Sequence, residues 1–154
     1  MNNMIRPPDG GTVEKSERHC IVLNLKSSIV HPRSPIEAWR AMDPIDLKII
    51  CETLAVNAAA YMFYFNKWMS FRVSLSPSWS SIDYTRDYKC IAIVGATDCP
   101  TDQYVFTQED RPLVIHKENL IPTPQIVDIL CSMLDSYRVP QNTVWRRRRI
   151  VLPD

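Results

Sequence analysis

The residues whose chemistry stands out most are four consecutive arginines near the end of the 154-residue chain, Arg146–Arg149, with Trp145 directly before them. Guanidinium groups donate forked hydrogen bonds that match phosphate oxygens, and several together release counterions from a nucleic acid. An indole beside them can stack on an exposed base. We therefore expect contact with a nucleic acid, RNA in preference to DNA, or with another anionic surface. The predicted contact residues are Arg138, Trp145, Arg146, Arg147, Arg148 and Arg149.

The same arginines would also attract other acidic partners. An anionic membrane surface, contacted peripherally, and an acidic protein surface are the two alternatives, because both act through the same Coulomb attraction. A structural role remains open as well, since basic residues on an edge strand protect it from aggregation. Residues 77–110 hold six acidic residues against two basic ones, and these acids could pair with the arginines internally. If residues 143–151 form a strand, Arg146 and Arg148 face one side and Arg147 and Arg149 the other.

A catalytic reading centres on Cys99, which follows Asp98 in a polar stretch. Together with His116 it could form a nucleophile and base pair, with Asp102 orienting the imidazole. Acidic neighbours raise the pKa of a thiol, however, which opposes formation of the reactive thiolate. A small cytosolic Cys/His-dependent hydrolase or transferase is therefore the competing hypothesis, and we predict no catalytic residues and no enzyme.

Cofactor and metal sites are not predicted either. The chain has three glycines, too few for the glycine-rich loops that hold phosphates in nucleotide-binding proteins. The residues that could ligate a metal are His19, Cys20, Cys90, Cys99 and His116, and they lack the closely spaced ligand pair of a structural zinc site.

The five cysteines are irregularly spaced and odd in number, which is typical of reduced thiols. The first residues lack the apolar segment of a signal peptide. The longest apolar run, around residues 58–65, is much shorter than the roughly 20 residues of a membrane span. We therefore expect a soluble protein of a reducing compartment, cytoplasmic or nuclear, that is neither secreted nor transmembrane.

Two long helices are predicted to organise the chain. Over residues 43–65, apolar side chains recur three or four positions apart, and Asp43 and Pro44 suit the first turn of a helix. Residues 123–138 show the same spacing behind Thr123 and Pro124. A short helix over residues 36–42 is expected to precede the first of these.

Strands are predicted where apolar residues alternate or run continuously. Residues 76–87 are rich in serine and aspartate and are expected to form a loop that exposes Trp79 as an interface anchor. Residues 1–18 are expected to be a mobile arm. The predicted strands are residues 19–26, 69–75, 89–96, 104–107, 112–117 and, as an edge strand or extended arm, 143–152.

These elements predict a single α+β domain over residues 19–154, with a mixed, mostly antiparallel sheet of four to six strands packed against the two helices. The hydrophobic fraction of 45% excludes a disordered chain, and the net charge of +1 points to no partner by itself. We expect a non-enzymatic binding or structural protein that uses its arginines and self-associates as a homo-oligomer. A virus-encoded matrix-like or accessory protein fits this composition, and a scaffold subunit docking on an acidic partner is the third hypothesis.

Overall fold

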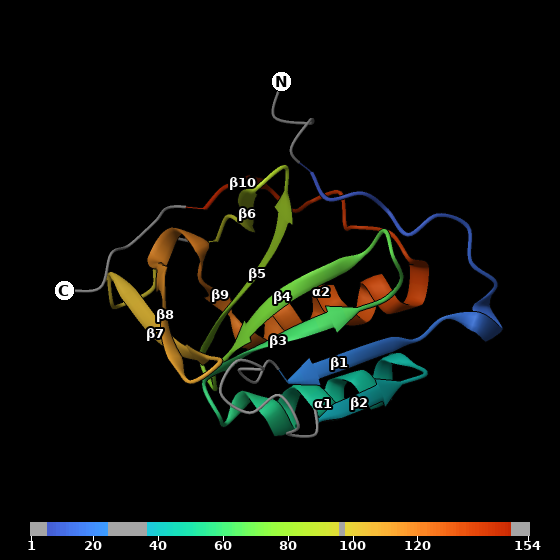
Figure 1. Cartoon of the computed structure of the whole chain (residues 1–154), viewed down its shortest axis with the longest axis horizontal. Helices are drawn as coiled ribbons and strands as arrows, with labels where there is room; N and C mark the ends of the chain where they lie inside the picture. The colour runs from blue at the N-terminus through green and yellow to red at the C-terminus, as the bar shows by residue number, and fades with distance from the viewer. Residues whose placement is uncertain (1–5, 25–36, 96–97, 149–154) are drawn as a thin grey trace.

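A computed structural model describes residues 6–24, 37–95 and 98–148 of the chain. Across these residues a large twisted sheet is covered on one face by two α-helices (Figure 1). The predicted α+β class is confirmed, but the sheet is larger than the four to six strands expected. The described residues form ten strands, several of them only two to four residues long. Strands this short are too brief to show an alternating pattern in the sequence.

The main path of the sheet runs in the order β10-β6-β5-β4-β3-β1-β2, with antiparallel neighbours throughout. β7 joins β3 through one parallel bridge, and β9 pairs with β5. The strands are β1 Cys20–Asn24, β2 Ala38–Ala41, β3 Ala59–Tyr64, β4 Ser70–Leu75, β5 Trp79–Arg86, β6 Lys89–Ile93, β7 Gln103–Gln108, β8 Arg111–His116, β9 Ile121–Pro122 and β10 Trp145–Arg147.

The first long helix is shorter than predicted. α1 spans Pro44–Ala55, and the Asp43 carboxylate accepts a hydrogen bond from the backbone N–H of Asp46 at 2.9 Å, as an N-cap should. The predicted extension to residue 65 is wrong, because Ala58 turns into the left-handed region (φ 48°) and β3 begins at Ala59. The large side chains of β3 also alternate between the two sheet faces, so their spacing fitted both a helix and a strand.

Two other local predictions are wrong. Residues 36–42 were expected to form a short helix, but Ala38–Ala41 is the edge strand β2, paired with β1. Residues 76–87 were expected to be a loop, but Trp79–Arg86 is β5, in the middle of the sheet. Both serines of β5, Ser80 and Ser81, are buried, and Ser80 is hydrogen-bonded within the fold, with its Oγ 2.7 Å from Thr123 Oγ1. Their polarity had suggested a solvent-exposed loop.

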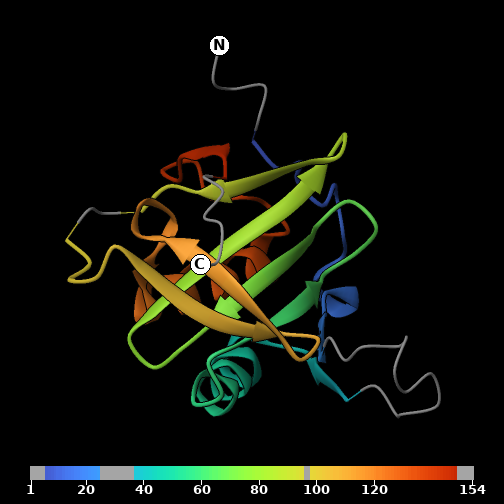
Figure 2. The same ribbon diagram turned by 60° about the vertical axis from the view of Figure 1, so that its left-hand side comes forward.

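The second helix is confirmed, and so are the predicted strands 104–107 and 112–117, which are β7 and β8. α2 spans Thr123–Ser136 and ends where Tyr137 adopts a left-handed conformation. β7 and β8 form an antiparallel hairpin that crosses the sheet at an angle (Figure 2). Cys99, Phe106, Ile115 and Leu120 form a second, small core on this hairpin side.

The main core lies between the sheet and the two helices. Phe63, Phe71 and Val73 from the strands meet Leu47 of α1 and Leu130 of α2. Predicted strands 69–75 and 89–96 are confirmed as β4 and β6, although residue 96 lies outside the described residues. β1 lies between β2 and β3, as expected for residues 19–26, of which 25 and 26 are not described.

Residues 6–18 of the predicted N-terminal arm lie against the body of the domain. The backbone N–H of Gly10 donates to the Tyr137 carbonyl at 2.8 Å, and the N–H of Val139 donates to the Asp9 carboxylate at 2.8 Å. Arg18 donates to the carbonyl of Asp135 at the end of α2. Mobility of the arm stays a prediction, and Arg6 and Pro8 of this segment line the site described below.

Candidate anion-binding site

The candidate site lies on the face of the sheet opposite the helices, which we call the open face. Direct cross-strand partners point to the same side of a sheet. Arg146, Ala92, Asp83, Arg72 and Met62 are successive partners across β10, β6, β5, β4 and β3, so they form one row. Charged side chains therefore reach the open face from strands at one edge and in the middle of the sheet.

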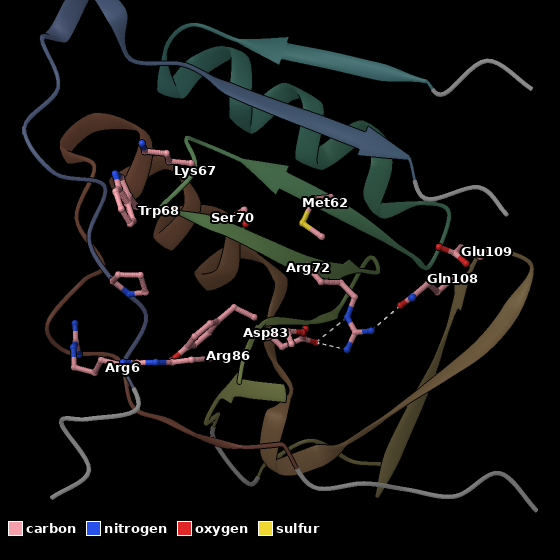
Figure 3. Close-up of a pocket in the computed structure, with 13 residues that line it drawn as sticks. Arg6, Met62, Lys67, Trp68, Ser70, Arg72, Asp83, Arg86, Gln108 and Glu109 are labelled. Carbon is pink, nitrogen blue, oxygen red and sulfur yellow. Dashed lines mark hydrogen bonds and ion pairs between the residues drawn. The ribbon is translucent and has the colours of Figure 1, made fainter. Parts of the chain in front are cut away.

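Arg72 and Asp83 form an ion pair at the centre of this row (Figure 3). Arg72 Nη2 and Nε lie 2.8 and 3.1 Å from Asp83 Oδ2, so two donors of one guanidinium meet the same oxygen. Arg72 Nη1 also donates to Gln108 Oε1 of β7 at 2.8 Å, which ties the hairpin to the sheet. The Asp83 side chain is only 3% exposed, so its charge depends on this pairing.

A second guanidinium approaches the same carboxylate. Arg148 Nη1 lies 4.0 Å from Asp83 Oδ2, and the Arg148 backbone N–H donates to the carbonyl of Cys90 at 2.8 Å. One carboxylate thus faces two guanidinium groups, which leaves an excess positive charge. Arg148 Nε is buried without a hydrogen-bond partner in the described residues, so this side chain is not fully satisfied by the protein.

A hollow of about 720 Å³ opens beside this pair. Its lining contains four basic side chains and two acidic ones, so the charge imbalance extends over the whole hollow. The lining residues are Arg6, Pro8, Met62, Lys67, Trp68, Ser70, Arg72, Asp83, Tyr84, Thr85, Arg86, Gln108 and Glu109.

Trp68 stands at the rim of the hollow, in the turn between β3 and β4 (Figure 3). Its side chain is 58% exposed, and Lys67 Nζ lies 5.0 Å from its ring centroid. The Asn66 side-chain oxygen accepts the backbone N–H groups of Trp68 and Met69 at 2.9 and 3.0 Å. These bonds fix the turn, so the indole is presented to solvent from an ordered position.

Arg6, on the N-terminal segment, forms another part of the wall of the hollow. Its guanidinium donates to four backbone carbonyls between residues 139 and 143, at 3.0 to 3.4 Å. Carbonyl groups hold this side chain in place without neutralising its charge. Arg86, at the end of β5, lines the same side of the hollow (Figure 3).

The predicted arginines differ in how far they are exposed and in where they lie. Arg146 and Arg147 are exposed on edge strand β10, and Arg148 is half-buried beside Asp83. Alternation puts Arg146 and Arg148 on the open face, as the sequence indicated. Arg138 is exposed just after α2, outside the lining of the hollow, and Arg149 lies outside the described residues.

Trp145 does not offer a face for stacking on a base. Its side chain is 2% exposed and packs in the main core, with its ring centroid 6.0 Å from those of both Phe71 and Tyr84. Its Nε1–H donates to Thr143 Oγ1 at 2.9 Å. The prediction that Trp145 belongs to a binding surface is therefore wrong, because alternation along β10 turns it inward while its neighbour Arg146 faces outward.

Trp79 lies at the start of β5, not in a loop. It is half-buried and packs against the small core of the hairpin side. Its proposed role as an interface anchor stays a prediction, with less free surface than the sequence suggested.

The Cys/His hypothesis finds little support in the geometry. The Cys99 side chain is buried, and its sulfur lies 3.7 Å from Thr101 Oγ1. His116 Nδ1 accepts the backbone N–H of Glu118 at 3.2 Å and so caps a short 3₁₀ helix. No hydrogen bond joins Cys99 to His116 in the described residues, where no cluster of three potential metal ligands occurs either.

The remaining thiols are held in their neutral form. All five cysteines are free. Burial raises the pKa of Cys51 to about 12. The pKa of Cys90 is raised mainly by burial and, to a smaller extent, by the nearby Asp83 charge. A raised pKa disfavours the thiolate, which is the nucleophilic form.

No protein-family model matches the chain, and no curated protein shows significant sequence similarity to it. Neither α-helix in the described residues is long and apolar enough to cross a lipid bilayer. The function of the chain must therefore be inferred from the site itself.

Most of the residues that line the hollow were not predicted from the sequence. Arg6, Lys67, Arg72 and Arg86 are isolated basic residues in the sequence, and only the sheet brings them together. One signal was available: Lys67 and Trp68 stand in a short polar break between two apolar segments, where a turn exposes its side chains.

Proposed function

We propose that this protein binds single-stranded nucleic acid, RNA in preference to DNA, on the open face of its sheet, and that it does so without catalysis. The observation that carries the proposal is the excess of basic side chains around a hollow whose rim holds an exposed tryptophan. This site keeps the predicted contribution of Arg146 and Arg148, and it replaces Trp145 with Trp68.

The charge arrangement suits a phosphate backbone. Arg146 at the sheet edge, Arg86 and Arg6 on one wall and Lys67 on the rim surround a central pair whose single carboxylate is shared by two guanidiniums. A chain of phosphates crossing this surface would meet several cations at once and release its counterions.

The exposed indole favours a single strand over a duplex. Unpaired bases stack on aromatic side chains regardless of sequence, whereas the bases of a duplex are already stacked. Trp68 stands beside Lys67, so one base could stack where its own phosphate meets a cation. An anionic membrane or an acidic protein would use the charges but would gain less from a fixed indole.

Fluorescence anisotropy with a labelled single-stranded RNA tests this proposal. Removing two cations, as in Lys67→Ala/Arg146→Ala, should weaken binding by about tenfold at moderate salt, since charge-assisted contacts to phosphate contribute most of such affinity. Thermal unfolding should change little, because Lys67 and Arg146 are both exposed.

The matched control is Lys15→Ala/Arg40→Ala, which removes the same two charge types outside the hollow. Lys15 lies in a short 3₁₀ helix and Arg40 on β2, at the opposite edge of the sheet from β10. RNA affinity should be unchanged in this variant. Equal losses in both double variants, or tighter binding to phosphatidylserine vesicles than to RNA, would rule the proposal out.

A further inference from the structure

A stripe of apolar side chains lies exposed along the outer surface of α1. Ile45 and Val56 are each 73% exposed, and Ile49 between them and Met42 just before the helix are also exposed. The opposite side of the helix, with Leu47, Cys51 and Leu54, is buried in the main core. Isolated apolar residues are common on protein surfaces, but Ile45, Ile49 and Val56 share one face of the helix, interrupted only by Glu52 and Thr53, and such a group marks a contact surface.

Ile45 and Val56 lie at the two ends of the stripe along the helix, and Ile49 stands one turn after Ile45. This part of the stripe extends over about 17 Å, at 1.5 Å per residue. Two antiparallel copies of α1 related by a two-fold axis near Ile50 would place Ile45 of each copy beside Val56 of the other.

The charges beside the stripe are self-complementary in the same arrangement. Lys48 and Glu52 are both exposed and lie along one side of the stripe, one turn apart. A two-fold axis keeps this side of both helices together, so Lys48 of one copy comes next to Glu52 of the other, and the reverse. The contact would thus gain two identical ion pairs.

Two hollows flank the stripe and give room for partner side chains. One of about 320 Å³ is lined by Trp39, Arg40, Asp46, Ile49 and Ile50. The other, of about 450 Å³, lies between Val56 and the start of α2 at Thr123 and Pro124. An apolar ridge between two depressions is the surface that two helices need in order to interlock.

We infer that α1 is the interface of a symmetric homodimer, whose occupant is a second copy of this chain. The inference goes beyond the nucleic-acid site and does not depend on it. The helices cover the sheet face opposite Arg72 (Figure 1), so dimerisation leaves both basic hollows uncovered. A pair of helices this short buries less surface than a standard interface, so the dimer is expected to be weak and concentration-dependent.

Sedimentation velocity over a series of protein concentrations tests this interface. The wild type should shift from monomer to dimer as concentration rises. Ile45→Glu/Ile49→Glu should raise the dissociation constant by at least about 100-fold, because four carboxylates would enter an apolar contact. Val105→Glu is the control, since Val105 is another exposed apolar residue, on β7, and its variant should dimerise normally.

A charge exchange separates a specific two-fold contact from general stickiness. Lys48→Glu alone and Glu52→Lys alone should each weaken the dimer by about fivefold, since exposed ion pairs are individually modest. Lys48→Glu/Glu52→Lys should restore wild-type affinity, because every opposite-charge pair is re-formed. Failure of the double variant to recover would overturn the antiparallel arrangement.

Cross-linking gives an independent check on the position of the axis. Ile49→Cys should form a disulfide-linked dimer under mild oxidation, because the two introduced thiols lie close to the axis. Val105→Cys and the wild type should stay monomeric on a non-reducing gel. A wild type that is monomeric at every concentration, or equal cross-linking through Val105→Cys, would refute the inference.

Discussion

The two faces of β4 and β5 carry different kinds of side chain. On one face Phe71, Val73 and Ile82 pack into the main core. On the other face Arg72 and Asp83, which alternate with them, form an ion pair beside an open hollow. The same backbone therefore supports two kinds of surface, and a shift of one residue separates a core position from a binding position.

The difference between a core position and a binding position should be largest for two tryptophans, Trp145 and Trp68. Trp145→Ala should destabilise the fold by about 3–5 kcal/mol, because a buried indole is removed from a packed core. Trp68→Ala should change stability by less than about 0.5 kcal/mol, since its ring is largely exposed. Urea unfolding of both variants measures this difference.

RNA binding should show the opposite order. Trp68→Ala should lose about 1–3 kcal/mol of binding free energy if one base stacks on the indole. Trp145→Ala, titrated under conditions where it remains folded, should bind nearly as well as wild type. Unchanged RNA affinity of Trp68→Ala would show that no base stacks on this indole.

The ion pair on the open face should matter for stability less than the core tryptophan does. Arg72→Met should cost about 2–3 kcal/mol, because Asp83 would keep only the more distant Arg148 as a charged partner among the described residues. Asp83→Asn should cost a similar amount, and Arg72→Met/Asp83→Asn should cost less than the sum. A double-mutant cycle by urea unfolding measures the coupling, and simple additivity would show that the two side chains do not depend on each other.

The core thiols should make stability depend on alkaline pH. The pKa of Cys51 rises from its ordinary value of 9.0 to about 12 because of burial, so the unfolded state loses this proton first. Its contribution is complete below pH 9 and is lost as pH rises towards 12, by up to about 1.4 kcal/mol for each pH unit. Cys51→Ala should be less stable at pH 7 but should show a flatter decline above pH 9 in thermal unfolding.

Much of the fold could be predicted from the sequence because it depends on repeated local signals. α2 has a proline in its first turn and periodic apolar residues, and β7 and β8 are apolar runs on either side of a short polar turn, so each pattern points to one structure. The end of α1 could not be placed, because the aromatic residues of β3 satisfy both helical and strand spacing. β5 was missed because its serines look like a loop in the sequence, whereas in the fold both are buried and Ser80 is bonded by Thr123 and by the backbone N–H of Ser76.

The candidate site was predictable only at its arginine-rich edge. The run of residues 146–149 signals positive charge, and alternation correctly divides Arg146 from Arg147. Whether Trp145 turns inward depends on Phe71 and Tyr84, which are more than sixty residues away in sequence. The hollow itself depends on side chains from the N-terminal segment, several strands and the turns between them, and no local pattern links them.

The open face is proposed to bind single-stranded RNA through its cations. The most direct test is to repeat the RNA titration over a range of salt concentrations for wild type, Lys67→Ala/Arg146→Ala and Lys15→Ala/Arg40→Ala. Log affinity falls linearly with log salt concentration. For a single strand, each lost phosphate contact makes this negative slope shallower by about 0.7. We predict a slope shallower by about 1.4 for Lys67→Ala/Arg146→Ala and an unchanged slope for Lys15→Ala/Arg40→Ala. An unchanged slope in Lys67→Ala/Arg146→Ala, or the same reduction in both variants, would contradict the account.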